Sequence, residues 1–286
     1  MTTTGRPPTR QPTLPGDDPA GPVIAVGTEF SRYVASTALL SLQDLRTAAP
    51  AEPSFLIITQ VMELLFKLSY IEARQARDQL EERSVEDAMN ALRRLREAQH
   101  VAVQSWGVLS ALSPVDYMRL RDDLGDASGF QSYAFRQWEF VLGKKDASLI
   151  RPYLGDPVAE PALRTALREP SVYDAVLGQF GRFGIKLPSA CLDKEWAEPY
   201  EPHPEVERAW RRVYDDPQRY ETLYRLAEAL MDVAYEFARW QSTHVLVVER
   251  VLGAKRGTGG TSGVAWLRKA GELRLFPELW TLRAGF

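Results

Sequence analysis

One histidine of this chain stands where its imidazole could do chemistry. His244 interrupts an apolar stripe whose other members recur three or four residues apart, namely Val233, Phe237, Trp240, Val247 and Val251. This spacing places all of them on one face of a helix. Such an imidazole is either a core histidine bonded to a neighbour or an axial ligand of haem iron, which needs one ring nitrogen in an apolar pocket. Zinc is less favoured, because the chain has only three histidines and one cysteine and none stands at metal-ligand spacing.

A tyrosine and an arginine form a second candidate site. Tyr117 and Arg121 are four residues apart in SPVDYMRLRDDLG, residues 113–125, so on a helix they share a face. A phenol beside a guanidinium offers several hydrogen-bond donors to a carboxylate. The alternative is a surface arginine paired with one of the aspartates nearby, Asp116, Asp122 or Asp123.

Residues 255–264, KRGTGGTSGV, combine four glycines, three hydroxyl side chains and two cations. This composition suits a loop that binds an anion. It is not a nucleotide-binding motif, because the lysine precedes the glycines, the glycines miss the G-x-G-x-x-G spacing, and a helix rather than a strand precedes them. A flexible connection between two helices is the alternative.

The elements that position these residues are predicted to be helices. Apolar residues recur at helical spacing nearly everywhere after residue 28, and no segment alternates convincingly as a strand. The pattern predicts helices over residues 55–80, 84–112, 114–124, 129–142, 160–168, 171–183, 203–214 and 216–252. The sequence therefore predicts an all-α helical bundle.

Short polar and glycine signals set the expected helix ends. Ser84 with Asp87 predicts a capping box. Ser113 followed by Pro114 predicts a helix start. Gly125 and Gly143 are predicted to end the helices that precede them.

Length and composition limit the class of protein. The 286 residues suffice for one large domain; we expect a disordered tail over residues 1–25 and a single helical domain over residues 26–286. The net charge of −3 gives no basic field for nucleic acid. The single cysteine fits a reducing compartment, the longest apolar run is too short to span a bilayer, and the N-terminus has no signal-peptide core. We expect a cytoplasmic protein that binds neither nucleic acid nor membrane.

Several stretches together resemble the tryptophan 2,3-dioxygenase family. They are FLIITQVMELLFKL (55–68), LSPVDYMRLRDDLGDASGFQS (112–132), RQWEFVLGKK (136–145), THVLVVERVLGAKRGTGGTSGV (243–264) and LFPELWTLR (275–283). The similarity covers about residues 28–284, and its most specific parts are G-F-Q-S and K-R-G-T-G-G. It implies an all-helical protein that binds haem b, is usually a homotetramer, and inserts oxygen from O2 into the indole ring of L-tryptophan.

The resemblance also implies roles for single residues. His244 corresponds to the axial ligand of the haem iron. Arg121, with Tyr117 beside it, corresponds to the arginine that binds the substrate carboxylate. Thr258 corresponds to a threonine that contacts the ammonium and carboxylate groups, and Phe55 to a residue that flanks the indole.

Four further positions follow from the same resemblance. Leu124 and Ser128 fall where the family lines the haem and substrate pocket. Tyr33 falls on one of two tyrosines that a neighbouring subunit lends to the pocket, and the other of that pair is Phe30 here.

The distal side departs from the family pattern. The family has a histidine before a glutamine, whereas this chain has Thr59-Gln60. A threonine hydroxyl is not a base near neutral pH and spans a shorter distance, although it can still hydrogen-bond directly or through a water. Leu65 replaces a family tryptophan, and PAEPS (50–54) replaces an acidic H-D-E segment.

We therefore expect a haem-dependent oxygenase that acts on the indole of L-tryptophan or of a substituted tryptophan such as β-methyltryptophan, with Thr59 at the distal position. Insertion of both oxygen atoms gives N-formylkynurenine, as in an ordinary tryptophan 2,3-dioxygenase. Insertion of one atom is a monooxygenase reaction, which needs a reductant, or peroxide as the oxidant. Relatives from antibiotic-producing bacteria resemble such monooxygenases of secondary metabolism, including a maremycin-pathway enzyme that acts on β-methyltryptophan. A non-catalytic sensor of haem or tryptophan, or a helical scaffold without haem, would account for part of the same pattern.

Overall fold

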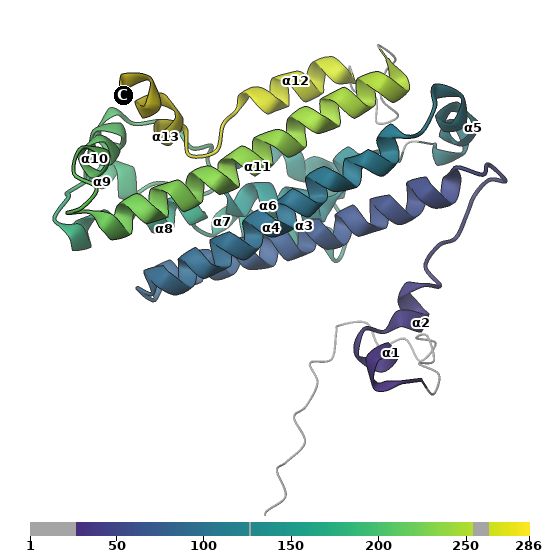
Figure 1. Ribbon diagram of the computed structural model, residues 1–286, viewed down its shortest axis with the longest axis horizontal. Coiled ribbons are helices and arrows are strands. Elements are labelled where there is room, and N and C mark those ends of the chain that lie inside the picture. Colours follow the sequence, from purple (N-terminus) through teal and green to yellow (C-terminus); the bar gives the residue numbers. More distant parts are fainter. Residues whose placement is uncertain (1–26, 126, 254–262) are drawn as a thin grey trace, which may run out of the picture. The chain divides into compact units, whose positions relative to one another are not determined.

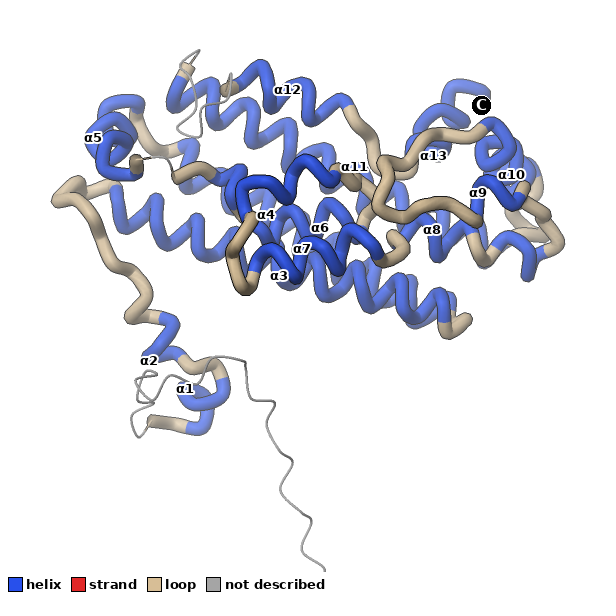
Figure 2. The backbone as a smooth tube through the Cα atoms, turned by 180° about the vertical axis from the view of Figure 1, so that it is seen from behind, coloured by secondary structure: helices blue, strands red, loops and turns tan. Residues whose placement is uncertain are grey.

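The computed structural model describes residues 27–125, 127–253 and 263–286. Within these ranges every regular element is a helix (Figure 2), so the predicted all-α fold class is confirmed. The chain divides into two compact units between Asp44 and Leu45. The predicted tail, residues 1–25, lies outside the described residues, and the single domain expected over residues 26–286 stays a prediction.

The N-terminal unit contains two short helices that the sequence did not predict. They are α1 (Glu29–Tyr33) and α2 (Ser36–Leu39), and neither has a buried residue. The Thr28 hydroxyl caps α1 by accepting a hydrogen bond from the Ser31 amide at 3.1 Å. Helices of four or five residues bury too little to show a periodic pattern, which explains why the sequence did not reveal them.

Three long helices form the frame of the second unit. They are α3 (Glu52–Glu81), α4 (Val85–Ser110) and α11 (Glu221–Leu252), and they lie side by side in Figure 1. All three were predicted, with ends that differ by up to five residues. A short turn at residues 82–84 reverses the chain between α3 and α4, so these two helices are antiparallel.

Two helices begin after a serine, Ser84 and Ser113, but only one of these side chains caps its helix. At α5 (Pro114–Leu124), the Ser113 hydroxyl accepts from the Asp116 amide at 3.1 Å, and the Asp116 carboxylate accepts from the Ser113 amide at 3.2 Å. This reciprocal pair confirms the predicted start, and Gly125, with φ of 57°, ends the helix as predicted. At α4, by contrast, the Ser84 side chain bonds the Asp87 carboxylate and caps no backbone amide. The capping box predicted there was wrong.

Two predicted helices are each divided in the structure. The segment expected over residues 129–142 consists of a 3₁₀ turn, η1 (Gly129–Gln131), followed by α6 (Tyr133–Val141). Ser132 starts α6 by accepting a hydrogen bond from the Phe135 amide at 3.1 Å. The segment expected over 171–183 similarly consists of α8 (Val172–Leu177) and η3 (Phe180–Phe183).

The remaining elements cover the long helices. Of these, α7 (Ala159–Arg168) and α10 (Pro204–Asp215) were predicted; the others are η2 (Ala147–Tyr153), α9 (Ser189–Leu192), α12 (Val264–Glu272), α13 (Pro277–Thr281) and η4 (Leu282–Gly285). Figures 1 and 2 show α12 along α11. In Figure 1 α6 and α7 lie behind α3 and α4, and in Figure 2, seen from the opposite side, they lie in front.

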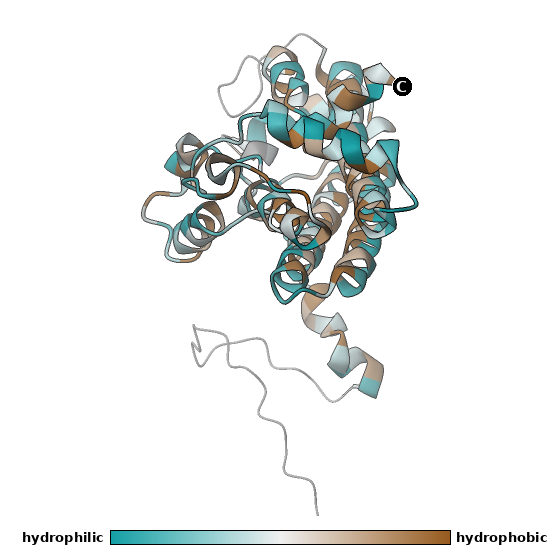
Figure 3. Ribbon diagram, turned by 90° about the vertical axis from the view of Figure 1, so that its left-hand side faces the viewer, coloured by the Kyte–Doolittle hydropathy of each residue, from teal (hydrophilic) through white to brown (hydrophobic). Residues whose placement is uncertain are grey.

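Apolar side chains lie mainly between the helices. In Figure 3 the helices carry hydrophobic and hydrophilic residues on different faces. The main core joins α3, α6 and α11 through Phe66, Trp138, Phe237 and Trp240, whose rings contact one another at centroid distances of 4.9–6.4 Å. This aromatic core fixes the helices that surround the cavity described next.

One helix among the described residues, α3, is long and apolar enough to cross a membrane by length and composition. The short apolar runs of the sequence predict no such segment. One face of α3 packs in the core through Met62, Phe66 and Ala73, although only 17% of its most apolar 18-residue window is buried.

Candidate functional site

A largely apolar cavity lies between α3, α4, α5, α6, α11 and α12. Its wall includes five residues singled out from the sequence: Phe55, Thr59, Tyr117, Ser128 and His244. Phe55 and Thr59 lie on α3, and the fold brings them together with Tyr117 on α5, Ser128 in the loop before η1 and His244 on α11. Around them the wall is mostly aliphatic and aromatic.

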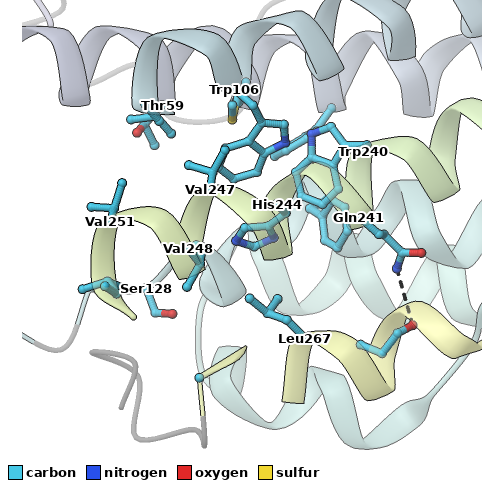
Figure 4. Close-up of a pocket in the computed structure, with 18 of the residues that line it drawn as sticks. Thr59, Trp106, Ser128, Trp240, Gln241, His244, Val247, Val248, Val251 and Leu267 are labelled. Atoms are coloured by element: carbon cyan, nitrogen blue, oxygen red, sulfur yellow. Dashed lines mark hydrogen bonds between the residues drawn. The ribbon is translucent and has the colours of Figure 1, made fainter. Parts of the chain in front are cut away.

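The imidazole of His244 projects from α11 into this cavity (Figure 4). The Trp106 indole stacks on it with ring centroids 4.5 Å apart and planes 18° apart. The Trp240 ring lies 5.3 Å away. Val247 and Leu267 contribute apolar wall nearby. The five apolar members of the predicted stripe are all buried, so the helical face inferred from the sequence is confirmed.

The state of this imidazole suits metal binding. Burial lowers the pKa of His244 to about 4, so the ring is neutral near pH 7 and one ring nitrogen carries a lone pair. No group of three or more His, Cys, Asp or Glu side chains that could hold a metal ion occurs in the described part of the chain. A metal at His244 must therefore bring most of its own ligands.

These residues fit a haem. Haem iron takes four nitrogens from its macrocycle and needs one axial side chain in a mainly apolar pocket. The cavity also contains hydrogen-bond donors that a ligand could use, because the buried indole N–H groups of Trp106 and Trp240 have no acceptor among the described residues. The donor set of one neutral imidazole is that of a haem site rather than of a bare-metal site.

The α3 wall presents Phe55, Thr59 and Glu63, one helical turn apart. The Thr59 hydroxyl donates a hydrogen bond to the Phe55 carbonyl oxygen at 2.7 Å. Facing them from α5, the Tyr117 ring lies 5.9 Å from the Phe55 ring, at 59°. Burial raises the pKa of Tyr117, and the Arg121 guanidinium acts against that shift. Arg121 is thus close enough to influence the phenol.

Charged side chains on α3 and α6 also line the cavity. The sequence did not identify them as site residues. Burial raises the pKa of Glu63, while a hydrogen bond from the Ser132 hydroxyl acts in the opposite direction. Arg136 and Glu139 form a buried ion pair, and the Lys144 ammonium lies 3.4 Å from Glu139. The sequence feature that could have indicated Glu63 is its position one helical turn after Thr59, which places both on the same face of α3.

The other predicted site residues lie elsewhere. Arg121 and Leu124 are half-buried on α5 but are not part of the cavity lining. Thr258, with the rest of residues 254–262, lies outside the described residues. Phe30 and Tyr33 lie on α1 in the separate N-terminal unit, where both side chains are exposed.

The two remaining histidines lie outside the cavity and contact polar groups. His100 is half-exposed, with Nδ1 3.6 Å from the Glu236 carboxylate. His203 is half-buried and caps α10, with Nδ1 accepting a hydrogen bond from the Glu205 amide at 3.1 Å. Neither lines the cavity, so His244 is the histidine that the cavity presents.

The chain is similar in sequence to known proteins over most of its length. The family model described as tryptophan 2,3-dioxygenase matches residues 18–154 and 164–285. A tryptophan 2,3-dioxygenase of Caulobacter vibrioides is 42% identical over 254 residues, which cover 89% of this chain and 97% of the relative. One of Pseudomonas fluorescens is 39% identical over 260 residues, covering 91% and 92%. Tryptophan 2,3-dioxygenase 1 of Ralstonia nicotianae is 39% identical over 254 residues, covering 89% and 86%.

Proposed function

Because this chain belongs to the tryptophan 2,3-dioxygenase family, a family of haem-dependent oxidoreductases, we propose that it is an oxygenase that inserts oxygen from O2 into the indole ring of L-tryptophan or a substituted tryptophan. The observation that carries the proposal is the neutral imidazole of His244 in an apolar cavity that also contains Phe55, Thr59 and Tyr117. The family model and the relatives confirm the family expected from the sequence.

We assign His244 as the axial ligand of a haem b. The haem, when bound, supplies the iron and its oxygen chemistry; the chain supplies ligation, orientation and exclusion of water. Stacking on Trp106 limits rotation of the imidazole. Val247, Val251 and Leu267 keep the surrounding wall dry.

The amino-acid end of the substrate is assigned to α5. Arg121 and Tyr117, on neighbouring turns, would bind the carboxylate through charge-assisted hydrogen bonds, together with Thr258. Leu124 and Ser128 would shape the space beside them. Holding this end fixes where the indole lies. Such positioning raises the rate because the entropy of orienting the substrate is lost on binding and not in the reaction step.

The indole is assigned to the space between α3 and α5. The tilted rings of Phe55 and Tyr117 offer aromatic faces for it. Because the Thr59 hydroxyl donates its proton to the Phe55 carbonyl, its oxygen can accept a hydrogen bond from the indole N–H. Thr59 thus orients the indole and takes no proton from it.

The proposal has two forms, which differ in the number of oxygen atoms that are inserted into the substrate. The names of the relatives support insertion of two atoms, which gives N-formylkynurenine. Thr59, a short hydroxyl side chain where the family has histidine, supports insertion of one atom. One-atom insertion from O2 yields a hydroxylated or oxindole product and one water, and consumes two electrons from a reductant and two protons; with peroxide no reductant is needed. The space left by threonine would suit an additional methyl group such as that of β-methyltryptophan.

Product mass after reaction with isotopically labelled O2 tests the proposal. The reduced, haem-loaded protein is mixed with L-tryptophan or β-methyltryptophan. Two labelled atoms in a ring-opened product indicate a dioxygenase, and one labelled atom indicates a monooxygenase. Haem-loaded protein that forms no oxygenated product from either substrate contradicts the proposal and favours a haem or tryptophan sensor. Protein without a Soret band favours a helical scaffold.

The assembly and location are part of the same proposal. We propose a cytoplasmic homotetramer in which Phe30 and Tyr33 belong to a segment that reaches a neighbouring subunit. The exposure of both aromatic side chains supports a role for that segment in contacts.

A further inference from the structure

One buried carboxylate at the start of α3 has no part in the site described so far. The segment PAEPS (50–54), which departs from the acidic lead-in of the family, retains one acid, Glu52. Glu52 is the first residue of α3 and is only 4% exposed. Burial of a carboxylate is costly unless hydrogen-bond donors surround it, so the donors that Glu52 has chosen indicate its role.

The donors come from the segment that precedes the helix. Oε1 of Glu52 accepts from the Arg46 amide at 2.7 Å, and Oε2 accepts from the Thr47 amide at 2.7 Å and from the Thr47 hydroxyl. The Thr47 hydroxyl oxygen accepts in turn from the Ala49 amide at 3.0 Å. We call residues 45–49 the strap. Glu52 fastens the strap to the first turn of α3.

The charge of Glu52 strengthens this attachment. The hydrogen bonds, above all the one from the Thr47 hydroxyl, hold the pKa of Glu52 below its usual range. The carboxylate is therefore ionised near pH 7, and each of its hydrogen bonds is charge-assisted.

The strap also reaches α5. The Arg46 guanidinium donates a hydrogen bond to the Asp123 carbonyl oxygen at 3.4 Å. Asp123 lies in the last turn of α5, where carbonyl groups lack partners within the helix and a positive side chain is favourable. Because Glu52 holds the Arg46 backbone, the start of α3 and the end of α5 are connected through a single residue.

The strap thus connects the two walls that are assigned to the substrate. Phe55 and Thr59, three and seven residues after Glu52, share its face of α3 and line the cavity. Tyr117 and Arg121 lie on α5, whose last turn the strap contacts. Figures 1 and 2 show α5 at the end of the bundle where α3 begins.

The separation of these walls matters because tryptophan is a short covalent link between an indole and an amino-acid group. If each wall holds one end, both ends fit only at one separation, and an error of about 1 Å in such positioning costs up to about a hundredfold in rate. The rings of Phe55 and Tyr117, with centroids 5.9 Å apart, also join the walls. Ring faces can slide past each other, whereas the hydrogen bonds of the strap are directional.

We propose that Glu52 is a positioning residue for the substrate: by holding the strap, it sets the separation between the α3 wall that receives the indole and the α5 wall that receives the amino-acid group. This inference rests on the proposed function, because it takes a tryptophan as the ligand. Glu52 contacts no reacting atom and acts through Arg46 and Thr47.

Equilibrium titration of the full-length, haem-loaded protein, followed by the Soret band, tests the inference. One ligand is L-tryptophan or β-methyltryptophan, whichever binds the wild type more tightly; it contacts both walls. The other ligand is indole, which contacts only the α3 wall. Glu52→Gln is expected to weaken tryptophan binding about tenfold, the equivalent of one charge-assisted hydrogen bond, and indole binding less than about twofold.

The matched control is Asp156→Asn. Asp156 likewise accepts hydrogen bonds from two backbone amides at the start of a helix, those of Val158 and Ala159, both at 2.8 Å, and it does not line the cavity. Both affinities of this variant should equal those of the wild type.

Milder substitutions keep the test valid if Glu52→Gln unfolds. Thr47→Val removes the hydroxyl bond to Glu52 and Thr47→Ser keeps it, so only Thr47→Val should weaken tryptophan relative to indole. Arg46 is exposed, so Arg46→Gln leaves the core intact. This variant should weaken tryptophan binding roughly threefold, because it removes one exposed contact.

The ratio of the two affinities decides the inference. Equal weakening of both ligands in Glu52→Gln would show that Glu52 only supports the fold, and this result overturns the inference. An unchanged ratio in Glu52→Gln, Thr47→Val and Arg46→Gln overturns it as well. Because binding is measured and not turnover, a chain with the expected ratios that oxygenates no tryptophan contradicts the proposed function alone. A wild type that binds neither tryptophan contradicts both.

Discussion

The imidazole of His244 illustrates how burial alone prepares a side chain for a function. In water a histidine is partly protonated near neutral pH, and a protonated ring cannot bind a metal. In the wall of this cavity, loss of hydration disfavours the charged form and lowers the pKa of His244 to about 4. The neutral ring needs no deprotonation to become a ligand.

Substitution of His244 should remove haem binding. His244→Ala is expected to lose the Soret band while keeping the helical circular-dichroism signal, because the fold does not depend on this one contact. Added imidazole should restore part of the band by occupying the vacated space. The control is His100→Ala, which removes a half-exposed ring outside the cavity and should retain full haem. An unchanged Soret band in His244→Ala contradicts the assignment.

Thr59 tests the distal side. If its short hydroxyl side chain favours one-atom insertion, Thr59→His should shift the product toward ring-opened N-formylkynurenine and reduce turnover of β-methyltryptophan. Thr59→Ser keeps the hydroxyl and should behave as the wild type. Chromatography with mass detection of the products compares the wild type with the two variants. Identical products and substrate preference in all three proteins would show that this position is a neutral replacement.

Glu63 provides a test of pH dependence. Burial raises its pKa in the folded chain, so the folded state holds this proton more tightly than the unfolded chain does. The resulting stabilisation is complete below the ordinary carboxyl pKa of about 4.3 and is lost as the pH rises through the raised folded value. Glu63→Gln removes the ionisation and keeps a hydrogen-bonding group. Its unfolding free energy, relative to the wild type, should therefore increase across this window.

Urea unfolding at a series of pH values measures this difference. The comparison variant is Glu97→Gln: the Arg96 side chain lowers the pKa of the exposed Glu97, so its dependence on pH should be weak and opposite in sign. Stability curves for Glu63→Gln and the wild type that stay parallel would contradict the burial argument.

At the scale of elements, the position of α5 matters because it carries Tyr117 and Arg121. This helix has eleven residues, too few to be stable alone. Its start is held by the reciprocal hydrogen bonds of Ser113 and Asp116, with Pro114 in the first turn. Local sequence therefore orients the element, and the Phe55–Tyr117 contact attaches it to α3.

Two serines give a matched test of this cap. Ser113→Ala should lower the unfolding free energy by about 1 kcal/mol, the usual cost of losing a side-chain cap. Ser84→Ala should change it by a few tenths of that, because Ser84 caps no backbone amide at the start of α4. Chemical denaturation of both variants checks the difference. Equal losses would indicate that the cap hydrogen bonds contribute nothing.

At the scale of the whole molecule, a buried carboxylate joins segments that are distant in the sequence. Glu278 on α13 accepts hydrogen bonds from the Tyr173 hydroxyl at 2.9 Å, the Tyr200 hydroxyl at 2.6 Å and the His203 amide at 2.9 Å. Tyr173 in turn accepts from the Trp210 indole at 2.9 Å. This network holds the C-terminal helices against α8 and α10.

Truncation of Glu278 should be strongly destabilising. Glu278→Ala leaves the buried Tyr173 hydroxyl and the half-buried donors of Tyr200 and His203 without this acceptor, and we expect a loss of roughly 3–5 kcal/mol of unfolding free energy. Glu278→Gln keeps one acceptor oxygen and should lose less. Glu207→Ala, which removes an exposed bond to Thr281 between α10 and α13, is the control and should cost under about 1 kcal/mol. Thermal unfolding that is the same in all three would contradict the role of this network.

The sequence by itself determined the helical class and the faces of the long helices. Burial periodicity is repeated many times along these helices, so the patterns of α3 and α11 were unambiguous. The position of His244 within an apolar stripe followed from the same repetition. The family also followed from sequence, because its motifs lie in continuous stretches.

Only the tertiary structure decided which residues meet. Thr59 and Tyr117 lie far apart in the sequence, yet both line one cavity, since this depends on how α3 and α5 pack. Glu63, Arg136 and Glu139 looked like ordinary charges of solvated helix faces, and only packing places them against the cavity. Ser84 and Ser113 precede similar local patterns, but the backbone at Ser84 adopts an angle that keeps its hydroxyl from the amides. The helix α3 has the apolar composition of a core helix, and only the arrangement of its neighbours shows that part of its apolar surface, including Leu64 and Leu68, is exposed.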